Sequence, residues 1–438
     1  MTAQRSITLL QGIALYMGAV LGSGILILPG YTAEVAGPAS IVSWVLLSLL
    51  SIPVAYTFAR LALRFAHFGG LATMVRHAFG PVWGAVAGWF FIVWVGTGQT
   101  VVGLTGAAYV THAFGLPPGW SFGIAFVFLL VALLSNFGGM RVSGWVSLLL
   151  SGAVLALLVA TIALALPRME PALFTPFAPR GLAGVGRACV LIFWAFFGWE
   201  SITHLVPEFR HPQRDVLRST WASVFLIGVV YTLLALVTVG THAYGSSAGT
   251  DAPLAVLMSR TIGFSAAAAT AAVACIVCLG TLNVYVASIS RLGHALASED
   301  QLPRWLGGVN RQGFPYRTAL FLFATNAAEL LLSYMWGIGV DKLILLPTTL
   351  GICLYLLASL ACVKLLWHDR VGRWSALLAA LCCLLVAPFA RGFLLAPLLV
   401  GCSCWLYLRW RGRRGRSASG GGETEQGGER EKSNKSRE

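Results

Sequence analysis

The chain has 438 residues, of which 57% are hydrophobic and 11% charged, with a formal net charge of +14. A soluble domain carries about 25% charged residues. Here the apolar residues come in runs near the ~20 residues that span a bilayer as a helix. Composition therefore excludes a soluble globular domain and indicates an all-α polytopic membrane protein. The short alternating strands of a membrane β-barrel do not occur.

The apolar runs predict about 12 transmembrane helices. The third and eighth are long enough to tilt or to protrude from the bilayer. No cleavage site follows the first run, so no removable signal peptide is expected. In chain order the predicted spans cover residues 7–36, 39–59, 81–111, 119–137, 143–166, 187–206, 219–240, 263–297, 317–337, 341–365, 372–390 and 392–409.

The placement of Lys and Arg predicts the orientation. If the N-terminus is cytoplasmic, the outer segments hold only a small share of the 30 Lys and Arg residues. Positive charge gathers on the cytoplasmic side, so both termini are expected there. This distribution explains the net charge without a nucleic acid partner. The outer residues would be Arg168, Arg180, Arg187, Arg260, Lys342 and Arg391.

Glycine interrupts two of the predicted spans: Gly22-Ser23-Gly24 in the first and Gly198 in the sixth. An unwound membrane helix exposes backbone groups that lipid cannot satisfy, so a break is tolerated only against protein, water or a ligand. The breaks are five spans apart, which is the pattern of an inverted repeat with a substrate site between its halves. The predicted organisation is a cytoplasmic N-terminus (1–6), a transport core of helices 1–10 (7–365), helices 11 and 12 (366–409) and a disordered basic tail (410–438).

Five segments form a set of motifs in a fixed order. They are Met17–Ile25 followed by Leu28-Pro29, Gly69-Gly70 to Gly88-Trp89, Phe193–Ser201, Pro207–Arg218, and Arg291 to Leu302-Pro303. Together they resemble the amino acid–polyamine–organocation transporters over about residues 7–365. Within that superfamily the chain is most like the bacterial L-methionine and branched-chain amino acid exporters. The resemblance implies a 5+5 inverted-repeat (LeuT-like) core in a bacterial inner membrane.

The first break is expected to bind the substrate carboxylate. Backbone N–H groups at Gly22, Ser23 and Gly24 begin the second half-helix, and a helix N-terminus favours an anion. The Ser23 hydroxyl can add a donor. The alternative is that these small residues only allow helices to pack closely. The resemblance favours binding.

The sixth span is expected to complete the site. Freed carbonyls around Trp194 and Phe197, beside Gly198, would accept from the substrate ammonium. Related exchangers place an outer-gate aromatic at the Trp194 position, with an interfacial tryptophan as the alternative. The resemblance makes Glu200 an inner gate, with a structural carboxylate as the alternative. Tyr285 in the eighth span would face the substrate, or else be a core tyrosine.

The expected activity is secondary active transport of a neutral, apolar amino acid. Glu200 is the only charged residue at the two breaks, so a charged substrate side chain would lack a partner. The favoured substrates are methionine, leucine, isoleucine and valine, moved outward by alternating access. The alternative is an amino acid/polyamine exchanger or an importer of the same superfamily. A membrane-embedded enzyme is a distant alternative, because no catalytic or nucleotide-binding motif is found.

The expected partners are the amino acid substrate and the lipid bilayer. Some relatives couple through a membrane lysine in helix 5, but span 143–166 has no charged residue, so that route is not expected. A proton is the candidate coupling ion. Neither a cofactor nor a metal is expected, because the nine cysteines lie in apolar runs, where Cys acts as a small hydrophobe. Oligomeric state is left open.

A few polar residues lie outside the predicted site. Glu329 lies in the ninth span, which is peripheral in the family, and a structural role is favoured. Asn283 is expected to form a hydrogen bond across helices. Gln99 and Asn136 have no assignable role. In the loop before helix 3, Met74 stands where relatives often have an aromatic residue.

Overall fold

The computed structural model describes residues 7–65, 70–137, 144–202, 206–246, 251–261 and 264–411. Regular structure in this part of the chain is helical, apart from one isolated backbone pairing. The predicted all-α membrane fold is therefore confirmed. The predicted N-terminus and nearly all of the predicted tail lie outside the described residues.

Long helices follow the predicted spans. By length and composition, ten helices in the described ranges could cross a membrane, and two of them, Gly24–Arg64 and Arg370–Arg411, each continue through more than one predicted span. The count of twelve and the inverted repeat stay predictions. The main helices are α1 (Leu9–Val20), α2 (Gly24–Ala36), α3 (Ser40–Arg64), α5 (Pro81–Ala113), α6 (Trp120–Phe137), α7 (Gly144–Ala165), α8 (Gly181–Phe193), α10 (Pro212–Gly240), α13 (Phe264–Ser298), α14 (Tyr316–Trp336), α15 (Val340–Leu343), α16 (Leu345–Leu365) and α17 (Arg370–Val386), with a last helix over 395–411.

Two helices begin well before their predicted spans. Helix α10 begins at Pro212, seven residues before the predicted span, because the charged turn after Pro212 continues the helix outside the apolar run. Proline suits the first helical position, where its missing N–H would have no partner in any case. Helix α8 begins at Gly181, so Arg187 lies within it. Hydropathy marked the apolar part of α10 and missed its polar first turns, while the glycine-rich start of α8 gave a weaker signal than the run that follows it.

Two further helices lie where loops were predicted: α4 (Leu71–Phe79) and α12 (Pro253–Thr261). Helix α4 is bounded by Gly70 and Gly80, whose φ angles of 89° and 92° end a helix and are favourable only for glycine. Met74 lies on α4 and is fully buried. The Lys364 ammonium donates to the carbonyl of Ala78 at 2.6 Å, which satisfies a free C-terminal acceptor of α4.

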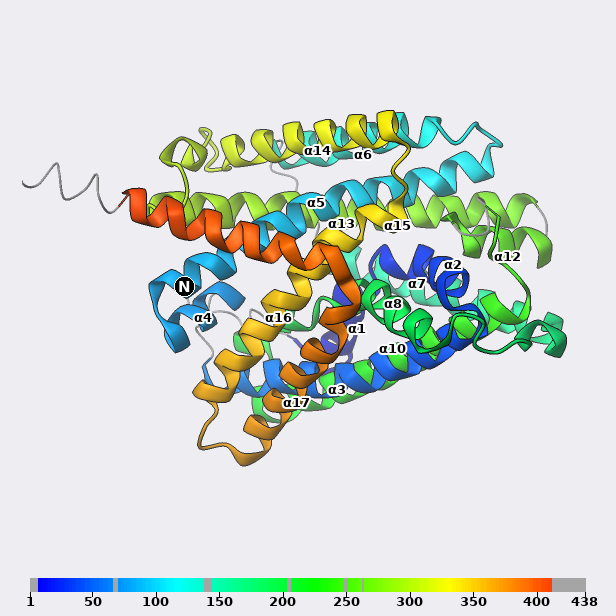
Figure 1. The fold of residues 1–438 in the computed structure, drawn as a ribbon, viewed down its shortest axis with the longest axis horizontal. Coiled ribbons are helices and arrows are strands. Elements are labelled where there is room, and N and C mark those ends of the chain that lie inside the picture. Colours follow the sequence, from blue (N-terminus) through cyan, green and yellow to red (C-terminus); the bar gives the residue numbers. More distant parts are fainter. Residues whose placement is uncertain are drawn as a thin grey trace, which may run out of the picture.

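The helices form layers around α1, α2 and α8 (Figure 1). Helices α14 and α6 lie along α5 and α13, which contact each other extensively, while α3 and α10 pair elsewhere in the bundle. Helices α16 and α17 pack together and against α5 and α3 respectively. The broken helices are thus enclosed by unbroken ones.

The start of the described chain is tied to the segment that follows the second break. Ile7 donates its N–H to the carbonyl of Glu208 at 2.9 Å, and Arg210 donates back to Ile7 at 3.0 Å. Thr8 and Gln11 then form a capping box at the start of α1. The first half-helix and the chain after the sixth span are therefore held together at this end.

Candidate substrate site

The first break has the predicted position. Helix α1 ends at Val20 and α2 begins at Gly24. In the described part of the chain, no acceptor is found for the backbone N–H groups of Ser23, Gly24 and Ile25. A Cβ atom added at Gly22 would meet nothing within 4 Å, so this residue faces unfilled space. The break therefore presents free donors beside an opening, as anion binding requires.

The second break also has the predicted position. Helix α8 ends at Phe193, a short 3-10 turn follows, and Phe197 is extended. Gly198 then has a φ of 119°, which an L side chain rarely adopts. A Cβ atom at Gly198 would lie 2.5 Å from the carbonyl oxygen of Ala19 at the end of α1. Glycine is thus needed for two reasons: the turn has a positive φ, and the two breaks approach too closely here for a side chain.

A tyrosine that sequence reasoning missed joins the two breaks. The Tyr231 hydroxyl, from α10, lies 2.9 Å from the carbonyl oxygen of Val20 and 3.3 Å from that of Ala195. Each of these acceptors comes from a half-helix end, where carbonyls lose their intrahelical partners. No sequence signal could have found Tyr231, because a tyrosine in an apolar span can donate to any nearby acceptor.

The indole of Trp194 lies in the core, with 6% of the residue exposed. A Cβ atom at Gly24 would lie 2.8 Å from its Cδ1, and one at Gly98 of α5 would lie 2.6 Å from its Cη2. The ring therefore fills a slot between two glycines. The alternative of an interfacial tryptophan is wrong for Trp194, because a belt tryptophan would reach the membrane surface.

Phe197 lies in an aromatic cluster beside Trp194. Its ring is centred 4.5 Å from Trp94, 5.0 Å from Tyr355 and 6.2 Å from Trp194. The 83° angle to Tyr355 is an edge-to-face arrangement, which aromatic rings favour. These rings form one packed aromatic cluster at the second break.

The neighbouring aromatics are also core residues. Phe196 packs on Trp44 and Tyr231, and Trp199 packs on Tyr16 with ring centroids 5.7 Å apart. Trp199 is fully buried. Both Phe196 and Trp199 are therefore core residues rather than lipid-facing ones.

The Glu200 carboxylate turns back onto the break. Its Oε2 accepts from the backbone N–H of Gly198 at 3.0 Å and from the Tyr355 hydroxyl of α16. The same N–H also lies 3.1 Å from the Tyr355 oxygen. This is the contact set expected of a structural carboxylate, and it is compatible with a gate that opens by breaking it. Tyr285 lies close enough to interact electrostatically with Glu200.

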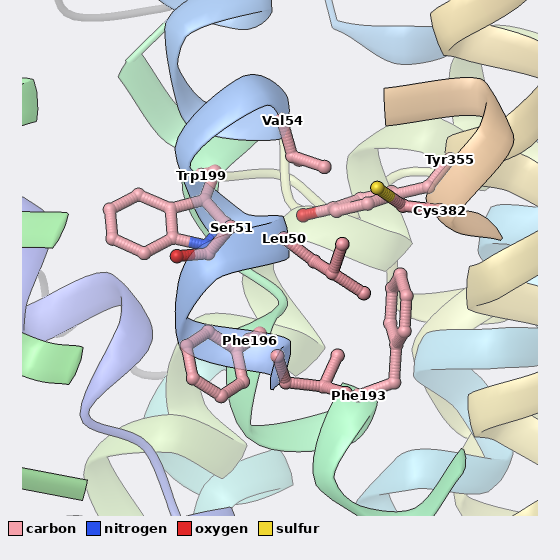
Figure 2. A pocket seen from close by; sticks show the side chains of 9 residues that line it. Leu50, Ser51, Val54, Phe193, Phe196, Trp199, Tyr355 and Cys382 are labelled. Atoms are coloured by element: carbon pink, nitrogen blue, oxygen red, sulfur yellow. The ribbon is translucent and has the colours of Figure 1, made fainter. Parts of the chain in front are cut away.

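A small cavity lies beside the second break, between α3, α16 and α17 (Figure 2). Its volume of about 10 Å³ matches one water molecule and is far too small for an amino acid. None of the predicted site residues lines it. The lining residues are Leu47, Leu50, Ser51, Val54, Phe193, Phe196, Trp199, Tyr355 and Cys382.

Two carboxyl groups outside the predicted spans, Asp251 and Asp300, form polar contacts at the two ends of the bundle. The Tyr31 hydroxyl of α2 donates to Asp251, just before α12, and burial raises the pKa of that carboxyl. At the other end, hydrogen bonds from Arg304 and Arg411 hold the pKa of Asp300 well below its usual range. Asp300 thereby ties the end of the last helix to the segment after α13.

Asn283 forms its predicted bond across helices. The Asn136 amide of α6 donates to the Asn283 side-chain oxygen of α13 at 2.6 Å, and Ser135 donates to the same oxygen at 2.8 Å. Asn136 thereby gains a role that the sequence did not assign. The described residues contain no cluster of three metal-ligating side chains.

Two broken membrane helices that meet inside a bundle, with free N–H groups at one break, are the architecture of a membrane transporter. The chain belongs to the amino acid permease family, whose model matches residues 7–401. It is 36% identical to uncharacterized amino acid permease YecA of Bacillus subtilis, over 93% of this chain and 96% of that protein. It is 29% identical to the L-methionine/branched-chain amino acid exporter YjeH of Escherichia coli, over 92% of this chain and 96% of the relative.

A further relative is the cadaverine/lysine antiporter of Escherichia coli, 28% identical over 76% of each chain. The predicted superfamily is therefore confirmed, and the chain is a multi-pass amino acid transporter. The relatives are named as permeases and transporters, in agreement with the prediction that the chain is not an enzyme. Their names differ in substrate and in direction.

Proposed function

We propose that the chain is a secondary active exporter of neutral, apolar amino acids. The substrates are methionine, leucine, isoleucine and valine. One observation carries the proposal: Glu200 is the only charged residue within 14–32 and 188–201, and its carboxylate is already engaged by Gly198 and Tyr355. A substrate with a charged side chain would find no free counter-charge, and burying an unpaired charge is costly.

The proposed binding mode uses both breaks. The substrate carboxylate accepts from the free N–H groups at Ser23 and Gly24, over the open side of Gly22. The ammonium donates to carbonyls around Trp194 and beside Gly198. The apolar side chain then lies against the rings that surround Phe197. Support comes from the free donors at the first break and the apolar, aromatic character of the second.

The proposed mechanism is alternating access, with one gate on each side of the substrate. Trp194 is the proposed outer gate, because it must leave the slot between Gly24 and Gly98 before a substrate can enter from that side. Glu200, with Tyr285 nearby, is the proposed inner gate. We place both termini in the cytoplasm of a bacterial cell, in agreement with the distribution of Lys and Arg.

Counterflow in proteoliposomes tests the substrate class. Liposomes loaded with unlabelled leucine should take up labelled leucine through the protein, and methionine, isoleucine and valine should compete. Arginine, lysine and putrescine should not compete, because the site offers their second charge no partner. Exchange of arginine or putrescine without exchange of leucine would refute the proposed substrates.

Dipeptide-fed cells test the direction. Cells supplied with a methionine-containing dipeptide release methionine internally, and expression of an exporter should lower the intracellular methionine while raising it outside. The matched control is Gly198→Ala, which disturbs the second break. A rise of intracellular methionine with the wild-type protein would show import.

A further inference from the structure

Glu329 is another carboxyl group in a predicted span, and its surroundings differ from those of Glu200. It lies half-buried on α14, where the Thr100 hydroxyl of α5 donates to its Oε2 at 2.7 Å. No cationic side chain forms an ion pair with it in the described ranges. A carboxylate away from water is expensive unless it is paired or receives several hydrogen bonds.

Two amide groups without partners lie in the same stretch of the interface. The Nε2 atom of Gln99 and the Nδ2 atom of Asn326 are buried and form no hydrogen bond within the described structure. These residues are 2% and 1% exposed respectively. Buried polar groups are nearly always hydrogen-bonded, so two unpaired amides in one interface need a physical explanation.

The register of α5 against α14 places the amides in the same interface as the carboxyl. A Cβ atom at Gly96 would touch Leu322 at 3.2 Å, while Thr100 bonds Glu329. Gln99 lies between the two contact points on α5, and Asn326 lies between them on α14. On a helix, residues three and four apart share a face. The unpaired amides therefore belong to the interface that holds Glu329.

The narrow space beside Gln99 has no room for a water molecule. In this space, trapped water therefore cannot satisfy the amide hydrogens of Gln99. Rotation of the side chains toward an ionised carboxylate would satisfy them, since a carboxylate accepts several hydrogen bonds. A neutral carboxylic acid needs fewer donors, and Thr100 alone suits it.

The titratable side chains of the elements packed on α14 do not supply a counter-charge. None of them is recorded in a hydrogen bond or ion pair with Glu329, and α6 carries none at all. They are Tyr109 and His112 of α5, Cys275, Cys278, Tyr285, Arg291 and His294 of α13, Arg304 after α13, and Tyr316, Arg317 and Tyr334 of α14 itself.

We propose that Glu329 is a proton-binding site, separate from the substrate site, with Thr100, Gln99 and Asn326 as hydrogen-bond donors for its ionised form. The neutral acid releases one proton to water and becomes a carboxylate, and no other bond is made or broken. That this proton is coupled to amino acid transport rests on the proposed function.

Helix α5 links this site to the outer gate. Gly98 faces the Trp194 ring, while Thr100, two residues on, faces Glu329. Two residues turn a helix by about 200°, so these contacts lie on opposite faces of α5. A shift of α5 that frees Trp194 also alters the contact between Thr100 and Glu329. Proton release and gate opening are therefore coupled through one rigid helix.

Gradient-driven transport separates this role from a structural one. In proteoliposomes with an imposed pH gradient, wild-type protein should accumulate leucine, and Glu329→Gln should lower that accumulation about tenfold or more, within the range typical of coupling between sites. Leucine counterflow without a gradient should change less than about twofold, because exchange needs no net proton movement. The matched control is Ser333→Ala, which removes a hydroxyl bonded to the carbonyl of Glu329 on the same helix.

Unchanged gradient-driven accumulation in Glu329→Gln, or a wild-type protein that ignores the pH gradient while exchanging leucine, would overturn the proposal. If leucine is not exchanged at all, the proposed substrate fails instead.

Infrared difference spectra of the purified full chain across a pH series test the proton site without transport. A protonated-carboxyl band that changes with pH in wild type should be absent in Glu329→Gln and present in Ser333→Ala. An identical band in both variants would refute proton binding by Glu329.

Discussion

The carboxyl groups of Glu200 and Glu329 are held in opposite ways. Glu200 accepts from the Gly198 N–H and the Tyr355 hydroxyl, both fixed by the break and by α16. Within the described part of the chain, Glu329 accepts from Thr100 alone, with the unpaired amides of Gln99 and Asn326 in the same interface. A carboxyl with a fixed set of donors supports one geometry. One with spare donors can change its protonation state without leaving its place.

The largest expected effect is that of Gly198→Ala, which removes the backbone geometry that Glu200 holds. The φ of 119° strains an alanine, and its Cβ would lie 2.5 Å from the Ala19 carbonyl oxygen. Backbone strain of this kind costs about 1–3 kcal/mol, and the clash adds to it. We expect leucine counterflow to be abolished, with a lower melting temperature in detergent.

Gly22→Ala is the matched control for this variant. A Cβ atom there meets nothing within 4 Å, so folding should be unaffected. Melting temperature measured for both variants separates strain from site chemistry. Wild-type counterflow in Gly198→Ala would show that the second break does not need its observed turn.

A smaller effect is expected for Glu200→Gln. The amide oxygen still accepts from Gly198 and Tyr355, so the break keeps its shape while the charge is lost. We expect slower exchange with a changed pH profile and largely retained leucine binding. Glu200→Leu should be worse, because each buried donor left without an acceptor costs about 1–3 kcal/mol.

The measurement compares leucine exchange rates as a function of pH for wild type, Glu200→Gln and Glu200→Leu. Equilibrium leucine binding is measured for the same three proteins. If Glu200→Gln keeps the wild-type rate and pH profile, Glu200 only clamps the break, and the inner gate lies elsewhere. That outcome would sharpen the contrast with Glu329, since all titration would then belong to the second carboxyl.

The two carboxyls also show where sequence reasoning succeeded and where it stopped. Glycine in an apolar span is a strong local signal, and both breaks lie where Gly22-Ser23-Gly24 and Gly198 predicted them. The partners of the breaks were not predictable. Tyr355 and Tyr231 come from other spans, and the sequence does not show which acceptor a tyrosine hydroxyl will bond.

Glu329 illustrates the same limit for a polar network. Its position in a peripheral span favoured a structural role, and Gln99 had no assignable one. Only the register of α5 on α14 brings them into one interface. Whether a buried amide has a partner depends on side-chain packing between helices that periodicity alone does not align.

The smallest expected effect is that of Thr100→Val, which keeps the shape of the side chain and removes one donor from Glu329. A neutral acid loses little, whereas the ionised form loses a charge-assisted hydrogen bond, which is about twice as strong as a neutral one. The pH at which gradient-driven leucine transport changes should therefore move upward, with counterflow at low pH nearly unchanged. Thr97→Val is the control, because the Thr97 hydroxyl bonds a carbonyl of its own helix, that of Val93, at 2.8 Å. An equal shift in both variants would mean that loss of any hydroxyl on α5 changes the profile, and the special environment of Glu329 would lose its support. A shift in Thr100→Val alone would tie the pH dependence to the one donor that distinguishes Glu329 from an unpaired carboxyl.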